Sequence, residues 1–253
     1  MPDKAYILCT TPRSGNTLLC DLLTDSGVAG QPDSFFRRES FREWADFFRV
    51  DNSAWDQDHF FDRTYLAATK QYGTNDTRVF GMRLMWESLN DLCSRLGALY
   101  PDKASDRDRL CAAFDSPNYI YLRREDKIAQ AISHLRAEQS GLWHAHADNS
   151  ERERLSPPKP LRYDYAEIAM LVDQHNAYER QWARWFNGQQ ITPIPVVYEQ
   201  LSADPAATLG ALLCRLELEP AKSTPAKPRT ARLADDTSQQ WYDRYLSEYR
   251  ARR

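Results

Sequence analysis

The stretch TTPRSGNTLL, residues 10–19, follows the apolar run AYILC and places a glycine between two polar segments. A short apolar run, a glycine turn and an apolar-periodic segment are the pattern of a buried strand followed by a helix. The N-terminus of such a helix has unpaired backbone N–H groups and a partial positive charge. A strand-to-helix turn that contains Gly15 therefore predicts a cradle for an oxyanion such as a phosphate.

Polar side chains surround this predicted cradle. Ser14, Asn16 and Thr17 are small donors, and Arg13 adds a full positive charge with a forked set of N–H groups. A nucleotide-binding P-loop has the same topology but ends in Gly-Lys-Ser/Thr, whose lysine contacts the β- and γ-phosphates. Here no lysine follows Gly15. The stretch favours a phosphate-bearing donor that needs no metal ion, and an ordinary strand-to-helix turn with a capping serine is the alternative.

The rest of the chain alternates strand-like and helix-like segments. Short runs rich in β-branched or aromatic residues predict strands over residues 5–10, 78–86, 118–124 and 193–201. Apolar spacing and capping residues predict helices over residues 16–24, 126–139, 165–186, 204–218 and 237–253. Strands separated by helices are typical of a parallel sheet, so an α/β fold is expected.

In two of the expected helices, the sequence indicates which residues pack against the rest of the protein. In the helix over residues 165–186, apolar residues recur at three- and four-residue steps, which predicts one buried face. His175 lies on that face and is expected to be a core histidine bonded to a neighbour. The C-terminal helix is expected to dock through Trp241, Tyr245 and Tyr249.

Length and charge limit the classes of protein that fit. The chain of 253 residues suffices for one large domain over residues 1–253 and is short for two. Its formal net charge of -3 argues against a nucleic-acid partner. Any bound anion must therefore contact a local group of positive charges and hydrogen-bond donors. Two proline-rich stretches, residues 156–160 and 222–229, are expected to be loops or stiff linkers, because proline lacks the backbone N–H.

The cysteines and apolar runs favour a cytoplasmic protein. No C-x-x-C pair occurs, and the scattered cysteines suit reduced, buried thiols: Cys9, Cys20, Cys93, Cys111 and Cys214. The apolar run near the N-terminus is shorter than a signal-peptide core, and no later run is long enough to span a bilayer. The expectation is therefore no integral membrane segment, with peripheral contact to a membrane substrate left open.

A second basic motif follows a predicted strand. The stretch YIYLRREDKIAQAIS, residues 119–133, ends a strand at Arg123 and Arg124 and continues into a helix that carries Ser133. Parallel α/β sheets bind ligands at the carboxyl ends of their strands, where these arginines are expected. The alternative is that they pair with Glu125 or another surface acid. Together with the first loop, the motif favours a second contact to an anionic ligand.

These two motifs resemble the cofactor motifs of sulfotransferases that use 3′-phosphoadenosine 5′-phosphosulfate (PAPS). More narrowly, the chain is similar to the bacterial trehalose and lipopolysaccharide sulfotransferase family in a series of stretches that occur in the same order over nearly the whole chain: SGVAGQPDSFF, VFGMRLMW, RREDKIAQAIS, SGLWH, VVYEQLSADPAATL and RLADDTSQQWYDRY. The resemblance implies a P-loop-NTPase-like sulfotransferase fold, a three-layer α/β/α domain with a mostly parallel central sheet. Relatives are often dimers, so a homodimer in which SGLWH contributes to the contact is an expectation.

The resemblance also implies a reaction and roles for the motif residues. A sulfuryl group would pass from PAPS to a hydroxyl of a sugar or glycolipid acceptor by in-line, metal-free transfer. Arg13 would stabilise charge on the leaving oxygen, with residues 14–17 around the phosphosulfate. Arg124, or Arg123 as an equally good neighbour, would hold the 3′-phosphate together with Ser133.

The acceptor hydroxyl needs a general base, for which several residues are candidates. Trehalose-acting relatives have a glutamate directly before the paired aromatic residues, and Ser34 stands at that position here. A serine cannot accept a proton at neutral pH without another group behind it. Asp33 is adjacent; an extended segment would turn it to the opposite face, whereas a loop would let it reach the acceptor. His144 is another candidate, and Glu39 and Glu87 are weaker ones.

The sequence also contains features that favour other functions. The serine at position 34 favours a catalytically idle module that only binds PAPS or its product. A kinase-like phosphotransferase is opposed by the missing loop lysine. His144, His146 and Asp148 alternate as metal ligands could, but no second ligand cluster supports them, so no metal is expected. Aromatic residues in the first half of the chain suit either a sugar cleft or the core: Phe35, Phe36, Trp44, Trp55 and Trp86.

Overall fold

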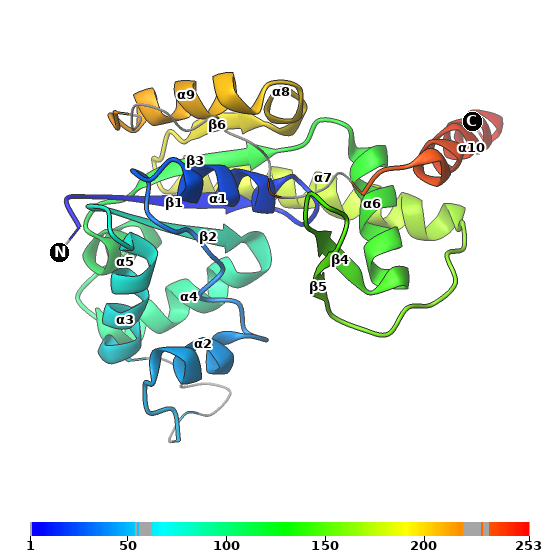
Figure 1. Cartoon of the computed structure of the whole chain (residues 1–253). Helices are drawn as coiled ribbons and strands as arrows, with labels where there is room; N and C mark the ends of the chain where they lie inside the picture. The colour runs from blue at the N-terminus through cyan, green and yellow to red at the C-terminus, as the bar shows by residue number, and fades with distance from the viewer. Residues whose placement is uncertain (1, 54, 56–61, 220–228, 230–232, 253) are drawn as a thin grey trace.

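The computed structural model of the chain describes residues 2–53, 55, 62–219, 229 and 233–252 (Figure 1). Its elements follow in chain order: β1 (Lys4–Thr10), α1 (Asn16–Asp25), α2 (Phe41–Phe48), α3 (Arg63–Thr74), β2 (Val79–Met85), α4 (Trp86–Leu99), α5 (Asp106–Phe114), β3 (Asn118–Arg123), α6 (Lys127–Ser140), β4 (Leu142–Ala145), β5 (Glu151–Arg154), α7 (Tyr165–Gly188), β6 (Ile194–Val197), α8 (Tyr198–Ala203), α9 (Pro205–Arg215) and α10 (Asp236–Ala251). No helix within these residues has the length and apolar character needed to cross a membrane.

The central sheet has four parallel strands in the order β2-β1-β3-β6. Thr10 at the end of β1 lies beside Met85 of β2, and Arg123 at the end of β3 lies beside Val197 of β6. The carboxyl ends of the strands therefore meet at one edge of the sheet. The loop after β1 and the two arginines after β3 both begin there, as the sequence predicts.

The strands alternate between two hydrophobic layers, as expected of a sheet covered on both faces. On β1, Tyr6 and Leu8 pack toward α1 and α9, while Ile7 and Cys9 pack toward α4, α5 and α7. In Figure 1, α1, α8 and α9 lie on one side of the sheet and α3, α4 and α5 on the other. The predicted three-layer α/β/α arrangement is confirmed.

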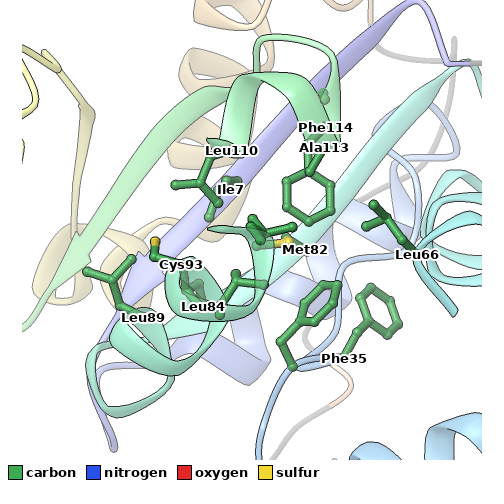
Figure 2. Close-up of a cluster of buried hydrophobic side chains, with 14 of the residues drawn as sticks. Ile7, Phe35, Leu66, Met82, Leu84, Leu89, Cys93, Leu110, Ala113 and Phe114 are labelled. Carbon is green, nitrogen blue, oxygen red and sulfur yellow. The ribbon is translucent and has the colours of Figure 1, made fainter. Parts of the chain in front are cut away.

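The larger core cluster joins β1, β2 and β3 to the helices on one face of the sheet. Figure 2 shows Ile7, Met82 and Phe114 gathered from β1, β2 and α5. Phe35, from the segment before α2, is fully buried in this cluster and packs edge-on against Trp44. Both aromatic residues after Ser34 are therefore core residues, so the backbone next to the predicted base position is firmly anchored.

The expected helices form, and Tyr249 is less buried than the other two aromatic residues predicted to dock α10. α7 buries its apolar face, and His175 on it is fully buried and bonds to His134, as predicted. In α10, Trp241 and Tyr245 are buried, whereas Tyr249 is 38% exposed and stacks on Tyr245. Tyr249 therefore lies at the edge of the docked face, next to the buried Tyr245.

The fourth predicted strand is shorter than expected. β6 ends at Val197 because β3, the strand beside it, ends at Arg123 and offers no further partner. The chain turns there into α8, so the prediction of a strand over residues 193–201 is wrong beyond Val197. The stretch over residues 156–160 is a loop as predicted, whereas residues 222–228 of the other proline-rich stretch lie outside the described residues.

All five cysteines are free, but they are not all buried. Cys9, Cys20 and Cys93 are buried, Cys111 is half-buried and Cys214 is exposed. α9 buries the face that carries its leucines, and Cys214 lies on the other side of the helix. The prediction of buried thiols is therefore wrong for Cys214.

Candidate active site

The loop between β1 and α1 has the backbone of an anion cradle. Gly15, the N-cap of α1, adopts a left-handed conformation with φ 85°, and Arg13 does so with φ 59°. A Cβ atom at Gly15 would lie 2.4 Å from the Tyr198 ring, so only glycine fits there. No side chain among the described residues caps α1, which leaves its first N–H groups to a ligand.

The polar side chains of the loop mostly hold the loop itself. The Ser14 hydroxyl is fully buried, lies 2.6 Å from the Thr10 hydroxyl and donates to the Thr11 carbonyl at 2.8 Å. Asn16 donates to the same carbonyl at 3.2 Å. Backbone N–H groups rather than these side chains are therefore the donors that the loop offers to an anion.

Two residues that sequence reasoning missed tie the loop to the helices behind it. Gln130 of α6 donates to the Pro12 carbonyl at 2.7 Å, and Trp182 of α7 donates to the Thr10 carbonyl at 3.0 Å. Both side chains are almost wholly buried. The loop is consequently preorganised, which lowers the free-energy cost of binding a ligand in it.

Arg13 turns its guanidinium across the loop toward α6. Its Nε donates to the Ser133 hydroxyl at 3.0 Å, and its Nη1 donates to the Trp143 carbonyl. Burial, together with the positive charge of Arg124, lowers the pKa of Arg13 to about 10. The guanidinium thus still carries its charge at neutral pH. Arg13 and Ser133, predicted from separate motifs, lie in direct contact.

The two arginines after β3 have different surroundings. Arg124 donates to the Arg13 carbonyl at 3.3 Å, and its guanidinium lies 4.5 Å from the centre of the Tyr198 ring. Arg123 instead forms an ion pair with Glu125 at 2.8 Å, with 38% of its side chain exposed. Arg124 therefore belongs to the site, whereas Arg123 has the surface pairing that the sequence left open as an alternative.

Arg83 of β2 lies between the first turn of α1 and the segment before α2, and the sequence did not single it out. Its guanidinium donates to Asn16 Oδ1 and Thr17 Oγ1, both at 3.1 Å, and to Ser34 Oγ at 2.7 Å. It also pairs with Asp33 Oδ1 at 3.2 Å. The arginine thus bridges the first turn of α1 and the segment before α2.

Asp33 and Ser34 face the same group, Arg83, as the sequence allowed for a loop at this position. The Asp33 carboxylate curls back and accepts from the Ser34 backbone N–H at 2.7 Å. The segment is a loop and not a regular strand, so the alternation of a strand does not apply to it. Asp33 is half-exposed and Ser34 is buried.

His144 lies on a hairpin of β4 and β5 that sequence reasoning missed. Its Nε2 is 3.0 Å from Thr17 Oγ1 and 3.4 Å from the Glu153 carboxylate. Arg152, next to Glu153, holds Asp21 of α1 in a two-pronged ion pair. The hairpin is thereby fixed onto α1, and His144 is brought to the cradle.

The pKa of His144 makes it a weak base in this structure. Burial lowers this pKa to about 3, and the positive charges of the neighbouring arginines contribute. His144 is therefore neutral at physiological pH.

Of the weaker candidates, Glu39 pairs with Arg37 at the surface, and Glu87 lies near Tyr178 in the first turn of α4. Within the described part of the chain, no cluster of His, Cys, Asp or Glu could hold a metal ion.

A pair of buried histidines lies directly behind Arg13. His134 Nδ1 is 3.3 Å from His175 Nε2, and the His134 ring packs edge-on against Trp143. Burial lowers the pKa of His134 to about 4 and that of His175 to about 3. Both rings are neutral at physiological pH.

This histidine pair predicts a loss of stability in mild acid. The unfolded chain gains protons at His134 and His175 below about pH 6.5, whereas the folded protein gains them only near their lowered pKa values. Stability is fully present above that pH, and each histidine removes up to about 1.4 kcal/mol per pH unit below it. In urea titrations, His134→Asn/His175→Asn is expected to flatten the fall in unfolding free energy between about pH 6.5 and about pH 5. An unchanged slope in the double variant would contradict the assignment.

The chain is similar to known sulfotransferases over almost its full length. The family model for Stf0 sulphotransferase matches residues 5–248. The trehalose 2-sulfotransferase of Mycobacterium tuberculosis is 29% identical over 265 residues, which cover 97% of this chain and 95% of the relative. The trehalose 2-sulfotransferase of Mycolicibacterium smegmatis is 30% identical over 267 residues, which cover 95% of this chain and 94% of the relative.

The family match includes the loop after β1, the arginines after β3 and the hairpin that carries His144. The resemblance to bacterial carbohydrate sulfotransferases is thereby confirmed over almost the full length. The chain belongs to the Stf0 sulphotransferase family.

Proposed function

We propose that the protein transfers a sulfuryl group from PAPS to a hydroxyl of a sugar acceptor, without a metal ion. The observation that carries this proposal is the loop after β1, in which left-handed Arg13 and Gly15 open the N-terminus of α1 beside a buried, charged guanidinium. No lysine follows Gly15 to contact a nucleotide triphosphate. Membership of a sulfotransferase family supports the same reaction class.

The residues present suit a donor with phosphate groups at both ends of its ribose. The cradle at Gly15, too tight for a Cβ atom, suits the close approach of an oxyanion to backbone N–H groups. Arg124 and Ser133 lie on the other side of Arg13 and suit a second phosphate. When bound, PAPS would supply the sulfuryl group and a leaving group that departs with negative charge.

Arg13 is the group best placed to stabilise that charge. Its guanidinium is buried, so its positive charge acts through a poorly screening environment. Its contacts to the Ser133 hydroxyl and the Trp143 carbonyl involve neutral groups. An anionic ligand can therefore replace these partners without breaking an ion pair.

Arg124 is expected to hold the 3′-phosphate, and Arg123 is the matched control. The two arginines are neighbours, but only Arg124 contacts the loop, while Arg123 pairs with Glu125. Arg124→Ala is expected to weaken binding of adenosine 3′,5′-bisphosphate about 10- to 100-fold, the usual cost of a lost charged hydrogen bond. Arg123→Ala should bind like the parent in isothermal titration calorimetry. Equal weakening in both variants would contradict the assignment.

Asp33 is the proposed general base for the acceptor hydroxyl. Its Oδ1 is held by the Ser34 N–H and by Arg83, and Oδ2 has no hydrogen-bond partner among the described residues. That oxygen is available to a hydroxyl that approaches from solvent. His144 is less suitable, because its Nε2 already contacts Thr17 and Glu153, whereas Oδ2 of Asp33 is open to the acceptor.

The acceptor is best sought among sugars. The two relatives are named for action on trehalose, so trehalose is the first compound to test, followed by sugars of lipopolysaccharide and other glycolipids. The assay supplies PAPS with labelled sulfate in the presence of EDTA and identifies the labelled product by mass analysis. Steady sulfate transfer supports the proposal. Tight binding of the bisphosphate with no transfer to any sugar would instead favour a catalytically idle binding module.

A further inference from the structure

Arg83 is shared between the two halves of the site. On the α1 side it donates to Asn16 and Thr17, the first two residues of the helix whose N-terminus forms the cradle. On the other side it donates to Asp33 and Ser34, each through a different nitrogen. One guanidinium therefore connects the donor-binding loop with the segment that carries the proposed base.

This segment depends on β2 for its position. The backbone N–H of Arg83 donates to the Asp33 carbonyl at 3.0 Å, which holds the segment along the edge strand. At its other end, Gly30 packs against the backbone of Val79 so closely that a Cβ atom there would lie 2.3 Å from the Val79 carbonyl. Arg83 thus contacts this segment through both its backbone N–H and its guanidinium, so the order of the segment depends on where Arg83 lies.

The positive charge of Arg83 lies next to the N-terminus of α1, where it would attract an anion bound in the cradle. Only 16% of its side chain is exposed, and within the described residues its one ion pair is the contact at a single oxygen of Asp33. Its contacts to Asn16 and Thr17 are to neutral oxygens, which hold a guanidinium more weakly than an anion does. The positive charge of Arg83 also acts on His144 and contributes to lowering the pKa of that histidine.

We propose that Arg83 is a positioning residue that couples the two substrate sites: an anionic donor at the N-terminus of α1 draws the guanidinium, and the guanidinium in turn sets the side chains of Asp33 and Ser34 for the acceptor. This inference rests on the proposed function, because it takes the cradle as the donor site. The coupling also predicts an effect of the donor on a segment outside the donor site. Occupying the cradle should tighten the segment over residues 30–36, which the donor itself need not touch.

Hydrogen exchange tests this coupling without any acceptor. Adenosine 3′,5′-bisphosphate at saturation is expected to slow exchange over residues 11–20, where it binds, and over residues 30–36 by about fivefold or more, a usual size for coupling between sites. In Arg83→Met the slowing over residues 11–20 should persist, and that over residues 30–36 should be lost. Ser34→Ala, which removes only the contact at 2.7 Å, should reduce the response over residues 30–36 in the same direction.

Arg95→Met is the matched control. Arg95 is also a poorly exposed arginine, but it pairs with Asp91 within α4, away from the loop. This variant should keep both responses, which separates the loss of a particular contact from the general cost of removing a guanidinium. Arg83→Lys should restore part of the response, because it retains the charge without the fork.

The outcomes separate the inference from the proposal on which it rests. A response over residues 30–36 that survives in Arg83→Met, or that is absent in the parent while residues 11–20 respond, would overturn the coupling alone. If the bisphosphate slows exchange at neither segment of the parent, the donor assignment fails and the coupling with it.

Discussion

Arg13→Ala is expected to lower kcat about a hundred- to a thousandfold, as happens when a fixed donor to a developing negative charge is removed. The guanidinium lies in the cradle loop, is poorly solvated, and keeps its charge at neutral pH because its pKa remains at about 10. In such surroundings a positive charge acts on an oxyanion far more strongly than it would in water. Steady-state rates of sulfate transfer from PAPS to a sugar measure the effect.

Two companion variants separate charge from shape. Arg13→Lys keeps the charge but lacks the forked set of donors, so its rate is expected to fall between those of the parent and the alanine variant. Arg123→Ala removes an arginine that pairs with Glu125 at the surface, and it should turn over like the parent. Near-parental turnover in Arg13→Ala would remove Arg13 from the mechanism.

Asp33→Asn is expected to lower kcat about a hundred- to ten-thousandfold, the usual range for loss of a general base. The amide keeps the size of the side chain and its contact with the Ser34 N–H, but it cannot accept the acceptor's proton at neutral pH. The acidic limb of the pH–rate profile should therefore disappear in this variant. Rates measured across pH with saturating PAPS show whether it does.

A comparison with His144→Gln decides between the two candidate bases. This variant can keep the contact with Thr17, and its pH–rate profile should retain the acidic limb, since the pKa of His144 is already lowered to about 3. Asp46→Asn, which alters an exposed carboxylate on α2, serves as the matched control and should leave both rate and profile unchanged. Loss of the limb in His144→Gln alone would make His144 the base.

The parts of the fold that could be predicted are those with strong local signals. β1, the loop and α1 follow from an apolar run, a glycine and helical spacing, and Asp204 with Pro205 begins α9 as its capping pattern indicates. The hairpin could not be found in this way. Its strand β5 reads ERER, with no apolar alternation, and it is held by tertiary contacts such as those of Arg152 to Asp21 and Glu153 to His144.

The candidate site was predictable where the residues lie in motifs. Arg13, Ser133 and Arg124 were identified from two stretches far apart in sequence, and the fold brings them together. Arg83 was not, because in VFGMRLMW it is one polar residue of an otherwise apolar strand, and nothing local shows what it contacts. Its proposed role depends on contacts to α1 and to the segment before α2, which form only in the folded chain.

The most direct test of the central claim is a crystal structure of the protein with adenosine 3′,5′-bisphosphate, grown with EDTA. The 5′-phosphate is expected within hydrogen-bonding distance of the backbone N–H groups of residues 14–17, with the 3′-phosphate at Arg124 and Ser133. A bisphosphate bound elsewhere, or a cradle that remains closed to it, would contradict the account.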